Sequence, residues 1–305
     1  MKDVDKNAEQ VEQIMAFKKK RRAVILVHNY QRPEVQDIGD FVGDSLELSQ
    51  KAARTDAEVI VFCGVHFMAE TAFILSPDKT VLLPDSGAGC PMADMITAEA
   101  LMKKKKEMPG SQVVCYVNSS AAVKAESDIC CTSANAVRVV QSLPPGEIIF
   151  VPDQYLGHFA AMKTGREMTL WPGYCPTHVK IQPEDIIEQK KKYPGSVALA
   201  HPECRPETRE AADEVMSTGG MIRYSRECDV STIILATETG ILHRLNKENP
   251  GKNFVAASRM AICPNMKKIT LEKVLWSLEE MNPRVTVPEE IRVRANIAVE
   301  RMISL

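Results

Sequence analysis

The chain has 305 residues, of which 45% are hydrophobic and 26% are charged. At roughly 100–200 residues per domain, this length allows two or three domains and a substantial core. Its 38 Lys and Arg residues nearly balance its 40 Asp and Glu residues, so the formal net charge is -2. This balance argues against nucleic acid as a partner, because nucleic-acid binding calls for a strongly basic face.

The hydropathy of the chain indicates a cytoplasmic protein without a membrane partner. No apolar run approaches the ~18 residues of a membrane-spanning helix. Residues 1–22 lack the apolar segment of a signal peptide. Thiols stay reduced in the cytosol, so we do not expect the nine cysteines to form a disulfide framework.

Taken in chain order, the predicted elements fall into three similar series. The first runs from a basic segment at 17–22 through an apolar strand at 23–30, a helix at 43–53 and strands at 59–65 and 80–84. The same order of elements recurs twice more. The second series has strands within 112–118, 148–153 and 168–173 and a helix at 132–143; the third has strands within 197–203, 232–238 and 253–257 and a helix at 217–224.

The spacing of equivalent residues supports an internal repeat. Each series ends in a loop with one cysteine, and these cysteines are 85 and 88 residues apart: Cys90, Cys175 and Cys263. The predicted helix starts that follow them, Thr97, Gln182 and Thr270, keep the same two separations. Two further sets of landmarks keep nearly the same period: His28, Val117 and His201, and Ser45, Ser133 and Thr218. A repeat at fixed period indicates repeated structural units.

Apolar strands that alternate with helices predict parallel sheets built by right-handed βαβ crossovers. We therefore predict an α/β fold of three αβα units, each with a small parallel four-stranded sheet, related by a pseudo-threefold axis. A linear array is the alternative, but it would leave three equivalent cysteine loops far apart. The predicted units are 1–88 plus 265–305, 89–173 and 174–264, with helices at 270–281 and 288–304 folding back on the first unit.

Polar residues follow the first strand of each unit. In open parallel sheets, ligands bind beyond the carboxyl ends of the strands. A single histidine after a strand is more often structural, but three polar clusters at equivalent ends favour a ligand site, because burying them without a ligand would leave polar groups unpaired. The clusters are His28-Asn29-Tyr30, Tyr116-Val117-Asn118 and His201-Pro202-Glu203.

Hydroxyl residues open a predicted helix in each unit, at Ser45, Ser133 and Thr218. Such residues are usually N-caps, but a helix N-terminus is also a ready anion site. If the threefold arrangement holds, three such sites point at one cavity. That cavity would suit a small molecule with two or three carboxylates or phosphates.

The three repeated cysteines form the third set of candidates. Three protein ligands leave a metal centre one open position, as catalytic sites require. The histidine of Cys175-Pro-Thr-His178 is close enough to support a ligand cysteine or to face substrate. The remaining cysteines have structural interpretations: four lie in apolar strands (Cys63, Cys115, Cys130 and Cys131) and two on loops (Cys204 and Cys228).

Several long motifs resemble quinolinate synthase, the A protein of NAD biosynthesis. They run in order from about residue 24 to residue 276: HNYQRPEVQDIGDFVGDSLELS, FMAET, CPMADM, YVNSSAAVKAESD, TSANAV, HPEC, STGGM and CPNMKKITLE. The resemblance implies three αβα domains about a pseudo-threefold axis, with one [4Fe–4S] cluster held by Cys90, Cys175 and Cys263. One iron would lack a protein ligand and act as a Lewis acid.

The resemblance also implies the reaction. A transferase would condense iminoaspartate with dihydroxyacetone phosphate, with loss of phosphate and two waters, to give quinolinate. An L-aspartate oxidase or dehydrogenase would supply the iminoaspartate. One departure stands out, because the family commonly has Gly-His-Cys at the second cysteine and this chain has Gly173-Tyr174-Cys175.

Carried over by position, the resemblance assigns roles to the strand-end and hydroxyl residues. The substrate contacts would be His28, Ser45, Tyr116, Val117, Asn118, Ser133, His201, Pro202, Glu203 and Thr218. Glu203 and His201 would perform general acid/base catalysis, while Tyr30 and Tyr116 would donate to carbonyl or leaving oxygens.

Three alternatives stay open at this stage. One is another iron–sulfur hydro-lyase acting on a dicarboxylate. The second is a non-enzymatic iron–sulfur sensor, which would not need the strand-end His, Tyr and Glu. The third is a zinc protein with three cysteine ligands.

Overall fold

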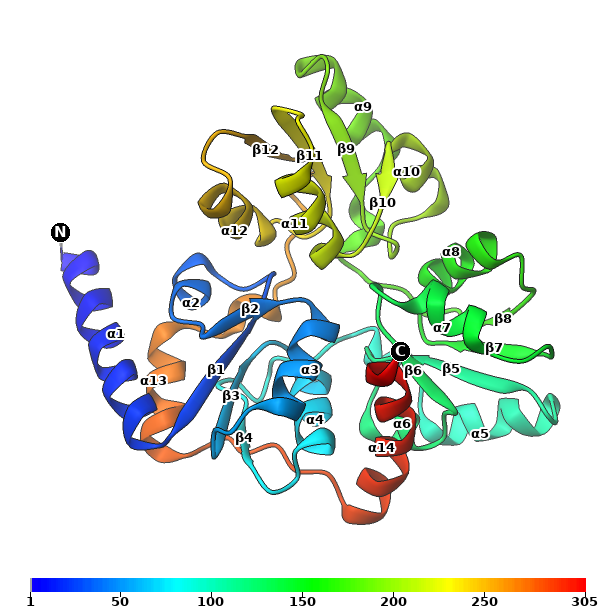
Figure 1. Cartoon of the computed structure of the whole chain (residues 1–305), viewed down its shortest axis with the longest axis horizontal. Coiled ribbons are helices and arrows are strands. Elements are labelled where there is room, and N and C mark those ends of the chain that lie inside the picture. Colours follow the sequence, from blue (N-terminus) through cyan, green and yellow to red (C-terminus); the bar gives the residue numbers. More distant parts are fainter. Residues whose placement is uncertain (1) are drawn as a thin grey trace.

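A computed structural model describes residues 2–305 and contains, within that range, three parallel four-stranded sheets with flanking helices (Figure 1). Every strand pair is parallel. The three sheets share one strand order, β2-β1-β3-β4, β6-β5-β7-β8 and β10-β9-β11-β12. The expected α/β class with three αβα units is confirmed, and Figure 1 shows the units around a common centre rather than in a row.

The first unit contains a sheet whose third strand is buried along its whole length, as a continuous apolar run predicts for a parallel strand. Helix α3 begins with a capping box, in which Asp44 accepts from two backbone N–H groups and Glu47 accepts from the Asp44 N–H. The elements of this unit are α1 (Lys2–Lys20), β1 (Ala23–His28), α2 (Pro33–Asp37), β2 (Phe41–Gly43), α3 (Ser45–Arg54), β3 (Val59–Cys63), α4 (His66–Leu75) and β4 (Thr80–Leu82).

The second and third units repeat this order. The second contains η1 (Ala93–Met95), α5 (Ala98–Glu107), β5 (Gln112–Tyr116), α6 (Ala121–Ala125), β6 (Ile129–Cys131), α7 (Ala136–Ser142), β7 (Ile148–Val151), α8 (Gln154–Thr164) and β8 (Thr169–Leu170). The third contains η2 (His178–Lys180), α9 (Pro183–Lys192), β9 (Val197–Ala200), α10 (Pro206–Ala211), β10 (Glu214–Val215), α11 (Thr218–Glu227), β11 (Thr232–Ala236), α12 (Ile241–Glu248) and β12 (Asn253–Ala256).

The structure after each repeated cysteine is the same in all three units. A short 3₁₀ helix begins three residues after the cysteine, as η1, η2 or η3 (Met266–Lys268). A longer helix follows each time, and its N-cap is Thr97, Gln182 or Thr270. These are the helix starts that the repeat predicted, so the period reflects a real structural equivalence.

Two helices complete the chain. Helix α13 (Leu271–Glu280) packs on α1 and β3 of the first unit, as expected. Helix α14 (Glu289–Ser304) contacts α4 and α3 of the first unit and also α6 and β6 of the second. The last helix therefore joins two units, and the domain boundaries drawn from the sequence stay a prediction.

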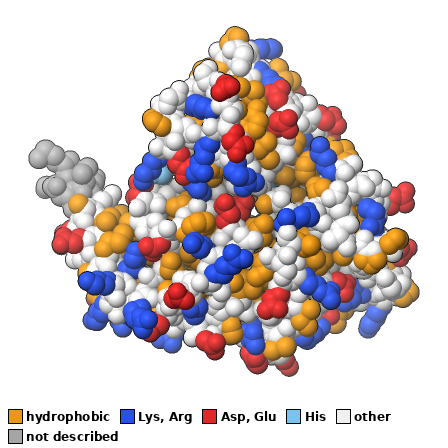
Figure 2. All heavy atoms as spheres, viewed as in Figure 1, with side chains coloured by type: hydrophobic (Ala, Val, Ile, Leu, Met, Phe, Trp, Pro, Cys, Tyr) orange, Lys and Arg blue, Asp and Glu red, His pale blue; other side chains and the backbone are white. Residues whose placement is uncertain are grey.

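The surface carries both signs of charge. Figure 2 shows Lys and Arg side chains interspersed with Asp and Glu over the visible face, in keeping with the net charge of -2. Among the helices of residues 2–305, none combines the length and the apolar character needed to cross a bilayer.

Candidate active site at the junction of the three sheets

A cavity of about 170 Å³ lies where the three units meet, and residues of every unit line it. Because the strands of each sheet are parallel, the residues after their carboxyl ends gather at this junction. Twelve of the fourteen candidate residues line the cavity: His28, Tyr30, Ser45, Cys90, Tyr116, Asn118, Ser133, Cys175, His201, Glu203, Thr218 and Cys263.

Val117 and Pro202 lie outside this lining. The Val117 N–H donates to the Cys131 carbonyl at 2.9 Å, and the Pro202 carbonyl accepts from Arg209 at 3.1 Å. These backbone bonds hold the loops that carry neighbouring cavity residues. Direct contact of the two side chains with substrate stays a prediction.

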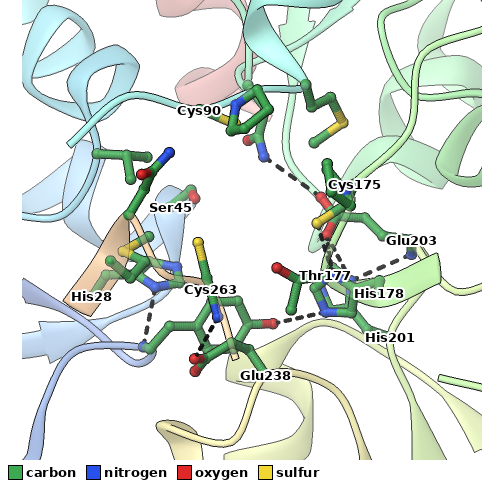
Figure 3. Close-up of a pocket in the computed structure, with 18 of the residues that line it drawn as sticks. His28, Ser45, Cys90, Cys175, Thr177, His178, His201, Glu203, Glu238 and Cys263 are labelled. Atoms are coloured by element: carbon green, nitrogen blue, oxygen red, sulfur yellow. Dashed lines mark hydrogen bonds and ion pairs between the residues drawn. The ribbon is translucent and has the colours of Figure 1, made fainter. Parts of the chain in front are cut away.

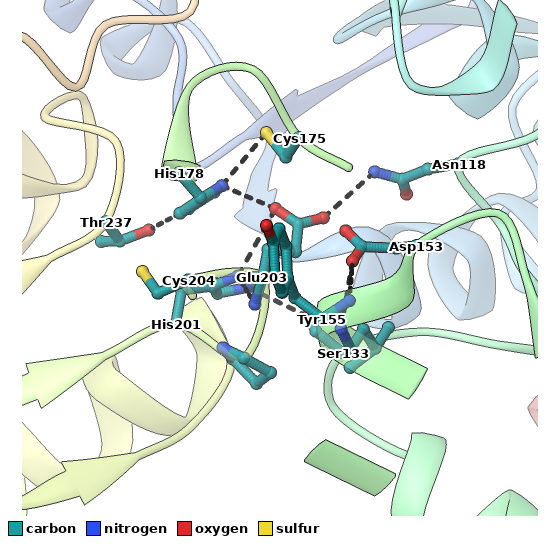
Figure 4. Close-up of polar contacts among 12 residues, drawn as sticks. Asn118, Ser133, Asp153, Tyr155, Cys175, His178, His201, Glu203, Cys204 and Thr237 are labelled. Carbon is teal, nitrogen blue, oxygen red and sulfur yellow. Dashed lines mark hydrogen bonds and ion pairs between the residues drawn. The ribbon is translucent and has the colours of Figure 1, made fainter. Parts of the chain in front are cut away.

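Glu203 is the most connected group in the cavity (Figure 4). One carboxylate oxygen accepts a 2.7 Å hydrogen bond from the Tyr116 hydroxyl and a 3.5 Å hydrogen bond from the Asn118 amide. The other lies 2.6 Å from Nδ1 of His178 and 3.5 Å from Nδ1 of His201. At 2.6 Å an imidazole nitrogen and a carboxylate oxygen share a proton, so the pair is arranged for proton transfer.

The surroundings of Glu203 shift its pKa and those of its neighbours. Burial raises the pKa of the Glu203 carboxyl, but attraction to His178 and the hydrogen bonds from His178 and Tyr116 outweigh burial and lower it. Burial and the nearby Glu203 charge raise the pKa of Tyr30 and Tyr116 well above the usual value. Both phenols therefore keep their protons at neutral pH and serve as hydrogen-bond donors.

His28 and His201 occupy equivalent positions and have equivalent geometry. In each case the backbone N–H two residues later donates to Nδ1, at 3.2 Å from Tyr30 and at 3.3 Å from Glu203. Burial lowers the pKa of each imidazole to about 3. Both rings are therefore neutral at pH 7 and carry their hydrogen on Nε2.

His178 links the carboxylate to the first unit. Its Nε2 lies 2.9 Å from the Thr237 hydroxyl, which also contacts the Tyr30 hydroxyl. Its ring stacks on His201 with centroids 4.5 Å apart. The spacing from Cys175 pointed to His178, whereas nothing in the repeat indicated Thr237.

The three repeated cysteines surround the same central space from three directions (Figure 3). Each is half-buried and free, and each comes from a different cysteine loop. Burial raises the pKa of Cys90 to about 12, and burial also raises the pKa of Cys175 and Cys263. Burial raises the pKa of Cys63, Cys131 and Cys204 as well, so the shared cavity and not the pKa distinguishes the three repeated cysteines.

The separation of the cysteine sulfurs bears on whether they could hold a single zinc ion or an iron–sulfur cluster. Within residues 2–305, the Cys175 sulfur, a His178 nitrogen and a Glu203 oxygen lie within 4.8 Å of one another, whereas the three cysteines do not form so tight a group. A single zinc ion, bound at about 2.3 Å by each sulfur, would need sulfurs within about 4 Å of one another. A cube-shaped iron–sulfur cluster separates its thiolates further, so the cysteines fit a cluster better than one zinc ion.

The hydroxyl residues are arranged differently in the three units. Ser45 and Thr218 are the first residues of α3 and α11, directly after the N-caps Asp44 and Ser217. Ser133 is not at a helix start, contrary to expectation. The Asn135 side chain accepts from the Thr132 N–H at 2.8 Å, which closes a turn and delays helix α7 until Ala136.

Comparisons with known proteins give the family of this chain. The family model described as "Quinolinate synthetase A protein" matches residues 12–304. The chain belongs to the quinolinate synthase family. A "Quinolinate synthase" of Dehalococcoides mccartyi (strain CBDB1) is 60% identical over 290 residues, covering 95% of this chain and 96% of the relative.

More distant members of the quinolinate synthase family align over nearly all of the chain. The "Quinolinate synthase" of Desulforudis audaxviator (strain MP104C) is 56% identical, covering 99% of this chain and 100% of the relative. The "Quinolinate synthase 1" of Methanosarcina acetivorans is 55% identical and covers 98% of both. The resemblance drawn from the motifs is thereby confirmed.

Two acidic residues that the family motifs did not single out complete the cavity wall. Asp44 lines it beside Ser45, and burial raises the pKa of its carboxyl. Glu238 lines it from the loop after β11 and is fully buried. The Glu238 carboxylate accepts from the Cys263 N–H at 3.0 Å, and this bond holds the third cysteine loop in place.

Proposed function

We propose that the protein condenses iminoaspartate with dihydroxyacetone phosphate to give quinolinate, phosphate and two waters, as a transferase of NAD biosynthesis. The proposal is carried by one observation, the hydrogen-bonded group of Glu203, Tyr116 and His178 that opens into a cavity with three free thiols. Membership of the quinolinate synthase family supports it.

Cys90, Cys175 and Cys263 would hold a [4Fe–4S] cluster, one per chain. The fit rests on three half-buried, free thiols that face one cavity from three loops. When bound, such a cluster with three protein ligands supplies one iron that is open to substrate oxygen and acts as a Lewis acid.

The hydroxyls of Ser45, Ser133 and Thr218 would bind carboxylate or phosphate oxygens. Ser45 and Thr218 open helices of ten residues each, and the helix dipoles favour an anion beside them, although Asp44 already accepts from two N–H groups of α3 and Ser217 from one of α11. The neutral imidazole of His28 adds an N–H donor, whereas the N–H of His201 lies 3.2 Å from the Ser133 hydroxyl. An anionic substrate is thus bound without an excess of Lys and Arg.

Glu203 would act as the general base and acid. Its ionised carboxylate removes a proton from the carbon that forms the new bond, and His178 passes protons to and from it across the 2.6 Å contact. Tyr30 keeps its proton at neutral pH and would donate to an oxygen that leaves as water, and Tyr116 would do the same once substrate replaces its hydrogen bond to Glu203. The buried position of Glu203, 3% exposed, keeps bulk water from competing for these protons.

The instability of one proposed substrate implies that a second enzyme supplies it. Iminoaspartate hydrolyses readily, so an oxidase or dehydrogenase acting on L-aspartate would supply it nearby. We place the protein in the cytoplasm, where its free cysteines stay reduced.

The test uses protein purified without oxygen and assays pyridine formation from iminoaspartate with and without dihydroxyacetone phosphate. We expect a brown, iron-containing protein that forms quinolinate only when both substrates are present. Iron-containing protein that dehydrates a dicarboxylate but forms no pyridine would identify another hydro-lyase. A colourless preparation without iron would overturn the cluster.

A further inference from the structure

We propose that Asn29, held by Arg244, fixes the Thr218 hydroxyl as a hydrogen-bond donor to an anionic ligand, which makes Asn29 and Arg244 positioning residues of the site. This inference rests on the proposed function of the cavity. The inference is that the Thr218 hydroxyl presents its hydrogen, and not a lone pair, to the ligand. The site would therefore accept ligand groups that carry a hydrogen-bond acceptor oxygen.

The orientation of the Asn29 amide follows from its two partners. Asn29 is fully buried directly after β1, and its Oδ1 accepts a 2.9 Å hydrogen bond from Nη1 of Arg244. A guanidinium can only donate hydrogen bonds, so the carbonyl oxygen of the amide must face Arg244. The NH₂ group of Asn29 then faces Thr218 and donates to its Oγ1 at 3.1 Å.

This contact determines what the Thr218 hydroxyl offers to the cavity. A hydroxyl has one hydrogen and two lone pairs. The Asn29 amide occupies one lone pair and cannot accept the hydrogen, because its own hydrogens point at Thr218. Thr218 lines the cavity and is 3% exposed, so its hydrogen is available to a ligand there.

Arg244 is itself held in place from both sides. Besides Asn29, its Nη1 donates to the Val42 carbonyl of β2 at 2.6 Å, and its Nε donates to Glu248 at 2.7 Å. Arg244 lies on α12 of the third unit, whereas Asn29 and Val42 belong to the first. The orientation of Thr218 therefore depends on correct docking of the first unit against the third.

Ser133 has a matching arrangement from a different pair of units. The Glu203 N–H donates to Nδ1 of His201, so the hydrogen of the neutral ring is on Nε2, 3.2 Å from the Ser133 hydroxyl. Here too a donor from a neighbouring unit occupies a lone pair of the hydroxyl. Both hydroxyls thus present hydrogens, which favours carboxylate, phosphate and carbonyl oxygens over amines.

The experiment measures quinolinate binding by calorimetry for the anaerobic holoenzyme and for Asn29→Asp, Thr218→Val and the double variant. In Asn29→Asp, a carboxylate oxygen accepts the Thr218 hydrogen and turns it from the ligand. We expect binding to weaken about tenfold or more, the size of one lost hydrogen bond to a charged group. In the Thr218→Val background the same change should weaken binding by less than about twofold.

Controls separate this effect from general damage. Asn246→Asp makes the same change at an exposed position of α12 and should leave binding unchanged. Arg244→Met releases the amide without adding a negative charge, and its effect should likewise vanish in the Thr218→Val background. Iron content and the unfolding midpoint report whether each variant is intact.

The outcomes are distinct for the two hypotheses. If the unmodified holoenzyme does not bind quinolinate, the proposed function fails. If it binds quinolinate and Asn29→Asp binds equally well, the proposed function stands and the inference is overturned. Equal losses with and without the Thr218 hydroxyl would show that Asn29 does not act through Thr218, which also overturns the inference.

Discussion

Tyr116 donates a 2.7 Å hydrogen bond to Glu203 although Tyr116 ends β5 of the second unit and Glu203 follows β9 of the third. On its other oxygen Glu203 contacts His178, which comes from the cysteine loop between those sheets. The carboxylate is therefore held by groups that come together only when the second and third units dock. A change that disturbs the packing of these two units should therefore also disturb the position of the Glu203 carboxylate.

We predict that Glu203→Gln lowers kcat by about 10²–10⁴-fold, the usual contribution of a general acid or base. The amide keeps the shape of the side chain but can neither take up nor release the proton. Product binding should change little. Steady-state assays with both substrates and quinolinate titration measure the two effects, and full activity of the variant would remove Glu203 from its catalytic role.

Substitution of a cysteine that lines the cavity and of a cysteine buried in a strand should have opposite effects on iron content and turnover. Cys175→Ser should abolish both iron content and turnover, because the cavity loses one of its three thiols. Cys131→Ser should leave both nearly intact, because Cys131 is fully buried in β6 and does not line the cavity. Iron analysis and visible absorbance of anaerobic protein distinguish them. Iron loss in Cys131→Ser without loss of fold would contradict the division.

The repeat made much of the fold predictable from the sequence. Equivalent cysteines at 85 and 88 residues placed three loops at one end of three sheets, and the helix starts after them were correct. Parallel strands put their carboxyl ends together whatever the details of packing. Six of the nine predicted strand-end residues accordingly line one cavity, whereas Asn29, Val117 and Pro202 do not.

Residue spacing did not predict features that depend on individual side-chain contacts. Ser133 matched Ser45 in spacing, yet the Asn135 side chain closes a turn and moves the helix start. The contact of Asn29 with Thr218 depends on how two units dock, which residue spacing does not encode. Glu238 did carry a partial repeat signal, because Asp153 lies 85 residues before it at the equivalent position after β7, but the first unit has Val65 there and the acidic pair was overlooked.

Glu238 offers a test of how the third cysteine loop is held. Its carboxylate accepts from the N–H groups of Cys263 at 3.0 Å and Gly240 at 2.7 Å, and Lys267 lies 3.0 Å from it. We predict that Glu238→Ala lowers the free energy of unfolding by about 1–3 kcal/mol, because buried donors lose their acceptor. It should also speed the loss of iron to a chelator.

An exposed acidic residue provides the matched comparison. Glu107 pairs with Lys104 at 3.4 Å on the surface of α5, where such a pair contributes at most about 1 kcal/mol. Glu107→Ala should therefore change neither unfolding nor iron release. Equal rates of iron loss from Glu238→Ala and Glu107→Ala would show that the Cys263 loop does not need the Glu238 acceptor.

Asp153 predicts a pH-dependent stability. One of its oxygens accepts from the N–H groups of Tyr155 at 2.8 Å and Leu156 at 3.1 Å, while the other is buried without a partner. Burial and the charge of Glu203 raise its pKa well above the usual value. The native state therefore binds this proton more tightly than the unfolded state, whose carboxyl titrates near pH ~3.9. Stability from this group is complete below that pH and is lost as pH rises toward the native pKa.

We propose the variant Asp153→Asn, whose side chain keeps the oxygen that caps α8 but does not titrate. The free energy of unfolding of Asp153→Asn minus that of the unmodified protein should therefore increase as pH rises from 4 to 7. Any fixed cost of burying the new NH₂ group is the same at every pH and cancels in this difference. Urea unfolding at several pH values measures it, and parallel stability curves for the two proteins would mean that Asp153 does not carry a raised pKa.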